Sequence, residues 1–128
     1  MWLPLAKAIL LCEDKLDGPA NTGNIHLMNV FSAIRPESFP HVKPQICVFL
    51  QLTDYRGEGG GNIIIRQADS ETIVYFGSEH QIEFLDRRQL KWVLFKCPDC
   101  RFPAPGVYWV EFHFKGELVV DQVLNVIG

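Results

Sequence analysis

The chain has 128 residues, of which 48% are hydrophobic and 21% are charged, and its formal net charge is −3. This balance is typical of a single globular domain and excludes a disordered chain. Nucleic-acid binding depends on clustered Lys and Arg that neutralise phosphates, so a net negative chain without such a cluster disfavours that function. No apolar segment approaches the length needed to span a bilayer.

The start of the chain, Met1 to Leu11, is apolar but does not have the features of a signal peptide. It has no cationic beginning, no small-residue cleavage site follows it, and Lys7 interrupts the apolar run. We therefore expect a first strand over residues 6–12 and a cytoplasmic protein. In a reducing compartment cysteines remain thiols, and Cys12 and Cys47, which lie in apolar runs, are expected to be core residues.

The next segments alternate between turn formers and strand formers. Residues 17–24 are dense in turn-forming residues. Residues 25–34 are apolar on both faces, which predicts a central strand buried on both sides, with His26 as a core histidine. Three prolines in residues 35–44 predict a loop that crosses between sheets. Residues 46–53 predict another strand.

A glycine-rich segment, residues 56–61, invites comparison with a phosphate-binding loop. Such a loop needs Lys and Ser or Thr at the start of a helix, whereas an isoleucine-rich strand follows here. We interpret the segment as a hairpin connection. Further strands are predicted over residues 63–66, 72–76, 82–85 and 89–96.

The last quarter of the chain gives the clearest structural signal, a β-hairpin around Lys115-Gly116 that is entered through a Pro/Gly segment. Alternation places four large side chains on one face, which we assign to the core: Tyr108, Val110, Phe112 and Phe114. We predict a three-residue loop with Gly116 left-handed, because a two-residue loop would bring Asp121 onto that core face.

The other face of this hairpin is too apolar for a freely solvated surface. Exposed apolar patches usually mark binding partners. We therefore predict an interface formed by Trp109, Val119, Val123 and Ile127.

Cys97-Pro98-Asp99-Cys100 is the only recognisable reactive motif. A redox pair usually lies at a helix N-terminus, and the prolines that follow do not allow a helix to begin there. A structural zinc site needs four ligands, and no second close Cys or His pair exists. We interpret the motif as an unpaired loop, with Cys97 and Cys100 as minor metal or redox candidates, and we expect no cofactor.

Two groups of polar residues are weaker candidates for a catalytic or metal site. Glu111, His113 and Asp121 are expected to lie together on the outer face of the hairpin, and a solvated polar patch is the favoured interpretation because no nucleophile accompanies them. Asp14, Asp17 and Asp54 are single acids in separate segments, without the ligand density of a calcium site.

Short strands at regular spacing, with turn signals between them, predict an all-β fold. We expect a two-sheet antiparallel β-sandwich with an Ig-like arrangement and about eight strands, as a single domain over residues 1–128. The proline-rich crossings favour this arrangement over a barrel.

Several segments taken together resemble a family of small bacterial proteins classed only as a domain of unknown function. They are Leu10-Leu11-Cys12-Glu13-Asp14, Met28-Asn29-Val30-Phe31, Phe39-Pro40 and the run from Phe102 to Tyr108. The resemblance covers nearly the whole chain and implies the all-β fold. It implies no catalytic residue, and Cys97 and Cys100 lie outside the pattern.

The function predicted from the sequence is a non-enzymatic protein-interaction or assembly module. Its partner would be another protein or a second copy, bound on the outer face of the terminal hairpin. The alternatives are a small-molecule or glycan-binding sandwich, which would use aromatic and acidic residues at one end, and a CxxC metal or redox protein.

Overall fold

The computed structural model describes residues 2–20 and 22–128, and the regular elements in these ranges are all β-strands. The all-β prediction is confirmed, but the described residues form eleven strands and not about eight. The strands are β1 (Leu5–Cys12), β2 (Asp14–Asp17), β3 (Ile25–Met28), β4 (Ala33–Ile34), β5 (His41–Thr53), β6 (Gly57–Gln67), β7 (Ile73–Phe76), β8 (His80–Phe84), β9 (Lys91–Phe102), β10 (Gly106–Phe114) and β11 (Glu117–Val126).

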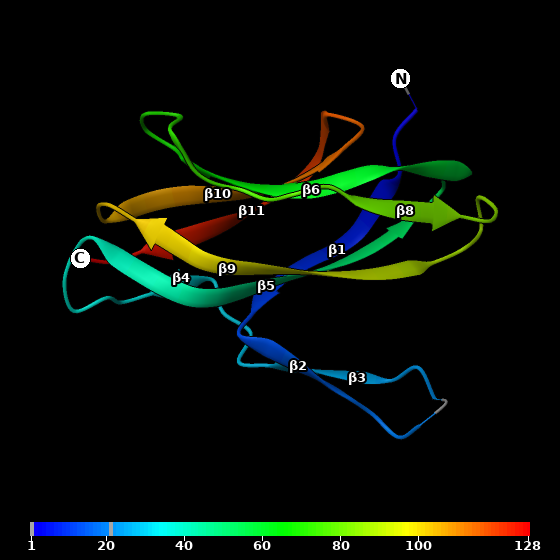
Figure 1. The fold of residues 1–128 in the computed structure, drawn as a ribbon, viewed down its shortest axis with the longest axis horizontal. Coiled ribbons are helices and arrows are strands. Elements are labelled where there is room, and N and C mark those ends of the chain that lie inside the picture. The colour runs from blue at the N-terminus through cyan, green and yellow to red at the C-terminus, as the bar shows by residue number, and fades with distance from the viewer. Residues whose placement is uncertain (1, 21) are drawn as a thin grey trace.

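The strands form two larger sheets and one small ribbon. One sheet has the order β1-β5-β9, and the six-stranded sheet has the order β4-β11-β10-β6, with β7 and β8 both beside β6. Strand pairs are antiparallel except for β4, which is parallel to β11. Figure 1 shows β6 and β10 in one layer, β5 and β9 in another, and the ribbon β2-β3 extending away from both.

The largest departure from the sequence prediction lies in residues 25–34, which do not form a central strand. Ile25–Met28 pairs with β2 in the ribbon, where His26 lies opposite Leu16 and is exposed. The backbone then turns at Asn29, whose φ is 54°. The assignment of His26 to the core is therefore wrong, because an apolar composition does not tell a buried strand from a ribbon. Met1, and Asn21 within the predicted turn, lie outside the described residues.

The glycine-rich segment is part of strand β6 and is not a connection, which corrects the prediction. Gly59, Gly60 and Gly61 are buried. A Cβ atom on Gly61 would lie 2.8 Å from Ile82 Cδ1 and 2.8 Å from Phe112 Cε1. The glycines therefore leave room for large side chains from the neighbouring strands to pack over the backbone.

The terminal hairpin forms as predicted, but its loop is shorter than expected. Lys115 and Gly116 both have positive φ values, 52° and 78°, as in a two-residue type I′ turn. A β-bulge follows, since His113 lies opposite Leu118 whereas Phe112 lies opposite Val120, so Val119 is the extra residue. The bulge shifts the facing of β11 by one residue, so Val120 lies opposite Phe112 and Asp121 stays off the core face. An odd-length loop would have had the same effect.

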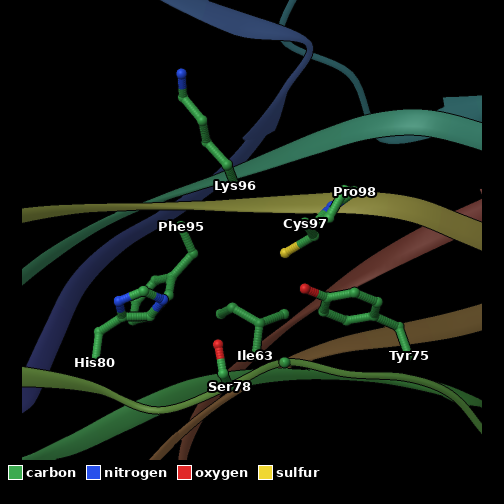
Figure 2. A pocket seen from close by; sticks show the side chains of 9 residues that line it. Ile63, Tyr75, Ser78, His80, Phe95, Lys96, Cys97 and Pro98 are labelled. Carbon is green, nitrogen blue, oxygen red and sulfur yellow. The ribbon is translucent and has the colours of Figure 1, made fainter.

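The two sides of the molecule differ in how the layers meet. On one side, residues 35–40 carry the chain from β4 in one sheet to β5 in the other, so the predicted crossing between sheets is confirmed. The loop is shorter than the predicted residues 35–44, because residues 41–44 already belong to β5. Leu11 forms an isolated bridge with Phe31. On the other side, β9 pairs with no strand of the described ranges except β5. A cavity of about 280 Å³ opens there between β9 and the β7-β8 segment (Figure 2).

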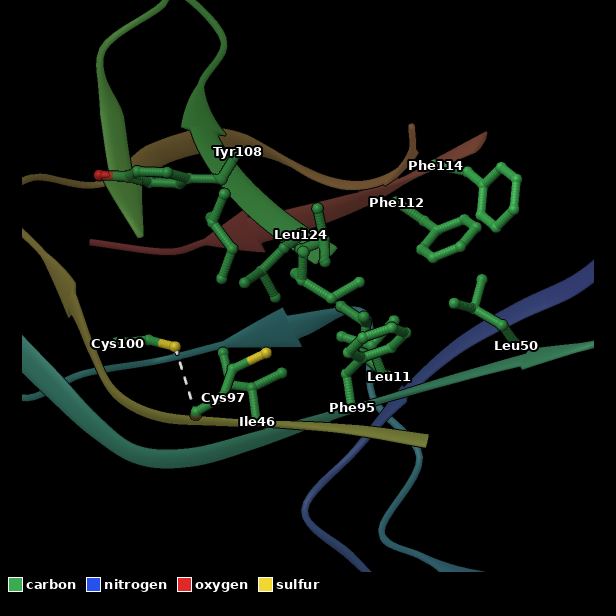
Figure 3. Close-up of a cluster of buried hydrophobic side chains, with 14 of the residues drawn as sticks. Leu11, Ile46, Leu50, Phe95, Cys97, Cys100, Tyr108, Phe112, Phe114 and Leu124 are labelled. Carbon is green, nitrogen blue, oxygen red and sulfur yellow. Dashed lines mark hydrogen bonds between the residues drawn. The ribbon is translucent and has the colours of Figure 1, made fainter. Parts of the chain in front are cut away.

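One hydrophobic core lies between the inner faces of the two larger sheets (Figure 3). The predicted core wall of β10 is confirmed, because its four side chains are fully buried: Tyr108, Val110, Phe112 and Phe114. Aromatic edge contacts join the layers, with the ring centroids of Phe102 on β9 and Tyr108 on β10 lying 5.0 Å apart. Packing of this kind is worth about 1 kcal/mol per pair beyond the area that is buried.

Candidate functional site

The candidate site is the outer face of the six-stranded sheet, which we call the hairpin face. Strand register sets its rows: Trp109 lies between Val123 and Arg66, and Glu111 lies between Asp121 and Ile64. The hairpin face comprises Trp109, Glu111 and His113 of β10, Ile64 and Arg66 of β6, Leu118, Asp121 and Val123 of β11, and Phe76 of β7.

Glu111 forms the centre of an ion cluster on this face. The Arg66 side chain donates two hydrogen bonds to its carboxylate, from Nε to Oε2 at 3.3 Å and from Nη2 to Oε1 at 3.4 Å. His113 Nε2 lies 2.9 Å from Glu111 Oε1. Glu111 is only 7% exposed although it lies on an outer face. The prediction of a solvated polar patch is therefore wrong for this residue.

The electrostatics of the cluster favour the charged carboxylate. Burial acts to raise the pKa of Glu111, but the hydrogen bonds from His113 and Arg66 and the Arg66 charge outweigh it, so the pKa lies below its ordinary value. Asp121, directly opposite on β11, is exposed. The ionised Glu111 carboxylate holds the Arg66 and His113 side chains in place, so its role in the cluster is structural.

Arg66 is the member of the cluster that the sequence prediction missed. It follows Ile63, Ile64 and Ile65, and in a strand it shares a face with Ile64. A single cation at the end of an apolar run was the available signal. Its ion-pair partner lies 45 residues away, on a strand whose register the sequence does not specify.

Large apolar side chains surround this cluster. Phe76 is 67% exposed and Leu118 is 47% exposed, while Trp109 and Val123 are half-buried opposite each other. Most large apolar residues are buried more completely than Phe76. The face therefore combines exposed hydrophobic surface with an internally neutralised charge cluster.

The four predicted interface residues separate into two groups. Trp109 and Val123 lie on the hairpin face. Val119, as the bulge residue, packs against the core, and Leu118 takes the outer position instead. Ile127 lies beyond the end of β11, where its backbone N–H donates to the Ile34 carbonyl at 2.9 Å.

Cys97 and Cys100 lie within β9 and not in an unpaired loop. They pair with Ile46 and Lys43 of β5, and Pro98 between them is tolerated because β9 is an edge strand. Both side chains are buried, and the Cys100 thiol donates to the Cys97 carbonyl at 3.5 Å (Figure 3). Burial raises the pKa of each to about 12, which opposes thiolate chemistry.

Cys12 and Cys47 are buried as predicted, and they lie directly opposite each other on β1 and β5. They are outside the core cluster between the two sheets, and the Cys47 thiol contacts the Glu13 carbonyl at 3.6 Å. Burial, followed by the neighbouring Cys47 thiol, raises the pKa of Cys12 to about 11. All four cysteines are free thiols.

The scattered acids do not converge. Asp17 pairs with Lys15 at 2.6 Å, and Asp54 pairs with Arg87 at 2.9 Å. Within residues 2–20 and 22–128, no three His, Cys, Asp or Glu side chains gather in a way that would hold a metal ion. The same residues contain no helix long and apolar enough to cross a membrane.

Comparison with known proteins places the chain in a family without assigning an activity. A family model described as "Family of unknown function (DUF6941)" matches residues 7–127. No curated protein matches the chain at a significant level. Because the family match covers nearly the whole sequence, the chain belongs to the DUF6941 family of unknown function.

Proposed function

We propose that this chain is a non-enzymatic protein-interaction module that binds a partner protein, or a second copy of itself, through the hairpin face. The observation that carries this proposal is the group of exposed apolar side chains, Phe76 and Leu118 with half-buried Trp109, around the Glu111 cluster. Trp and Arg are enriched among the residues that dominate binding energy at protein interfaces.

The ion cluster supports docking because its charges are already paired. A buried charge without a partner costs several kcal/mol, whereas the Glu111 carboxylate keeps Arg66 and His113 as donors when another surface covers it. A partner therefore needs to supply only apolar surface over the cluster, with hydrogen bonds at its rim. Half-buried Trp109 provides a fixed aromatic anchor in the middle of this face.

We also propose that the architecture is a β-sandwich with an Ig-like arrangement. The sheet β1-β5-β9 corresponds in order to Ig strands A, B and E, and β11-β10-β6 corresponds to G, F and C. The Tyr108 hydroxyl donates to the Ala104 carbonyl at 2.6 Å, which resembles the tyrosine corner of strand F. A crystal structure with β9 hydrogen-bonded to β8, which would join the two sheets, would contradict this assignment.

A cytoplasmic location is part of the proposal, and the four buried free thiols support it. Cys12 and Cys47 are directly opposite each other, so an oxidising compartment would favour a bond between them. Cell fractionation would test the location, and recovery in an extracytoplasmic fraction would contradict it.

Site-specific photo-crosslinking tests the function. A photoreactive amino acid is placed at Phe76 or at Leu118, with Val42, 47% exposed on the other sheet, as the matched control. In the cells that make this protein, we expect discrete crosslinked products from positions 76 and 118 and none from position 42. Light scattering of the purified protein then shows whether the product is a self-dimer. Equal crosslinking at all three positions would exclude a specific interface on this face.

A further inference from the structure

We propose a second binding site, separate from the hairpin face: the free edge of β9 accepts an extended peptide segment of a partner protein, which adds to the β1-β5-β9 sheet as a fourth strand. β9 runs for 12 residues and pairs with β5 alone among the strands of residues 2–20 and 22–128. The backbone groups on an edge that has no neighbour are a template for another strand.

The edge carries exposed apolar side chains at its beginning. Trp92 is 46% exposed, and Leu90, just before the strand, is 51% exposed. A long apolar edge is normally protected by charges or bulges, or covered by another segment. Here Pro98 and Asp99, whose φ is 51°, interrupt the later half of the strand, and Lys91 and Lys96 flank the uninterrupted apolar stretch of residues 92–95.

Hollows lie on both faces of this edge, which is the pattern that an added strand requires. On the inner face, the cavity of about 280 Å³ reaches Phe95 and Cys97. On the outer face, a hollow of about 170 Å³ lies against Trp92, Leu94 and Phe49. Successive side chains of a strand point to opposite faces, so neighbouring residues of one bound peptide would enter these two hollows in turn.

A third hollow joins the other two across the edge. It has a volume of about 410 Å³ and is lined by His80, Val93, Leu94, Phe95, Lys96 and Lys15. It shares His80, Phe95 and Lys96 with the inner cavity, and Lys15, Val93 and Leu94 with the outer hollow. The three hollows are therefore neighbours along β9.

The inner cavity selects a large side chain with a polar end. Figure 2 shows Ile63 and Phe95 as apolar walls and the hydroxyl groups of Tyr75 and Ser78 directed into the space beside Cys97. The His80 ring stands edge-on to Phe95, with centroids 5.6 Å apart. A tyrosine or tryptophan side chain, whose ring carries an O–H or N–H group, fits this lining.

Charge distinguishes a partner peptide from a second copy. Lys96 lines the joining hollow with a side chain that is 55% exposed and lies 3.9 Å from Asp14, whereas the Lys15 charge is already paired with Asp17 at 2.6 Å. Lys91 begins the strand. Figure 2 shows Lys96 on the opposite side of β9 from Cys97. If two β9 edges paired antiparallel with Val93 opposite Leu94, Lys91 would lie opposite Lys96, and directly opposed like charges are destabilising. An apolar segment flanked by acidic residues is complementary to the same edge.

The test uses a phage-displayed library of short random peptides, selected against the whole chain. We expect enriched peptides with large apolar residues at neighbouring positions and acidic residues beside them. Each of the two alternate sets of backbone nitrogens in an enriched peptide is N-methylated in turn. The set whose N–H groups face β9 should weaken binding by at least about tenfold when methylated, because its hydrogen bonds to the strand edge are lost, whereas the other set should have a smaller effect. Lys96→Glu should weaken binding severalfold, and Ser78→Trp, which fills the inner cavity, should abolish it.

A variant of the hairpin face tests whether the β9 site binds peptide independently of that face. The Phe76→Glu/Leu118→Glu variant should bind the enriched peptide unchanged, so failure of one site does not imply failure of the other. No enrichment, or unchanged binding of both N-methylated peptides, would overturn the proposal. A self-dimer that crosslinks through position 92 would replace the peptide with a second copy and would also overturn it.

Discussion

Glu111 connects the chemistry of single residues to the stability of the fold, because its carboxylate is buried between Arg66 and His113. Its folded-state pKa lies below the ordinary value of 4.5. The stabilisation that this charge provides is thus fully present above the unfolded-state pKa and is lost as the pH falls through the folded-state pKa.

The first prediction follows from the lowered pKa of Glu111. Glu111→Gln should lower the free energy of unfolding near neutral pH by roughly 1–3 kcal/mol, because it removes the charge and keeps the side-chain size. The difference from wild type should shrink as the pH falls below about 4.5. Urea unfolding across this range measures it, with exposed Asp121→Asn as control. A deficit that does not change with pH would contradict the ion cluster.

The second prediction at this scale concerns the thiols. Burial raises the pKa of Cys97 and Cys100 to about 12 and that of Cys12 to about 11, so the reactive thiolate is scarce at pH 8. A thiol reagent should label none of the four cysteines in the folded protein and all four after unfolding. Rapid labelling of Cys97 in the folded protein would show that the cavity beside it admits the reagent and that the thiol is activated.

At the scale of elements, the bulge in the terminal hairpin gives a sharp contrast between neighbouring residues. Leu118 is 47% exposed opposite His113, whereas Val119 packs against the core. We expect Leu118→Asp to leave the free energy of unfolding within about 0.5 kcal/mol of wild type, and Val119→Asp to lower it by about 2 kcal/mol or more. Thermal or denaturant unfolding measures both. The reverse order would mean that the hairpin pairs without the bulge.

The glycines of β6 make a second element-scale prediction. Gly61→Ala should destabilise the protein by roughly 1–3 kcal/mol, because the new methyl group meets Ile82 Cδ1 and Phe112 Cε1, each at 2.8 Å. Ile82→Val deletes one of those two atoms, so the double variant should lose less stability than the sum of the single variants. Strict additivity of the two free-energy changes would show that the contact with Ile82 is not made.

The elements themselves were predictable where local chemistry decides them. The turn at Lys115-Gly116 and the alternation through Phe112 predicted the hairpin and its core face, because both depend on adjacent residues. The bulge at Val119 was not predictable, since it depends on β6 and the core fixing the position of β10. Residues 25–34 failed for the same reason: tertiary contacts decide whether Ile25 lies in a ribbon or in a central strand.

For the whole molecule, strand count and spacing were sufficient to predict an all-β chain with antiparallel sheets. The order of strands in each sheet was not, because β5 and β9 pair over a long sequence separation that no local signal encodes. The candidate site was only partly predicted for this reason. Trp109 and Glu111 follow from the alternation of β10, whereas Arg66 and Phe76 join them through pairings of β6 and β7.

The molecule exposes two different surfaces on separate sheets: the hairpin face on the six-stranded sheet and the edge of β9 on the three-stranded sheet. The hairpin face is the central one, since it combines Phe76, Leu118 and Trp109 around a neutralised cluster. Its role does not depend on peptide binding at β9. A variant confined to Phe76 and Leu118 changes the proposed docking surface and leaves the core cluster untouched.

The most direct test is an affinity capture with three tagged forms of the chain, followed by measurement of the partner recovered by each. The forms are wild type, Phe76→Glu/Leu118→Glu, and the control Val42→Glu, and circular dichroism and thermal unfolding first establish that all three are folded. We predict that wild type and Val42→Glu recover the same partner, or the same self-dimer, and that the double variant recovers less than a tenth of it, about 1.4 kcal/mol of lost binding. Equal recovery by all three folded forms would contradict the proposal that the hairpin face is the binding surface.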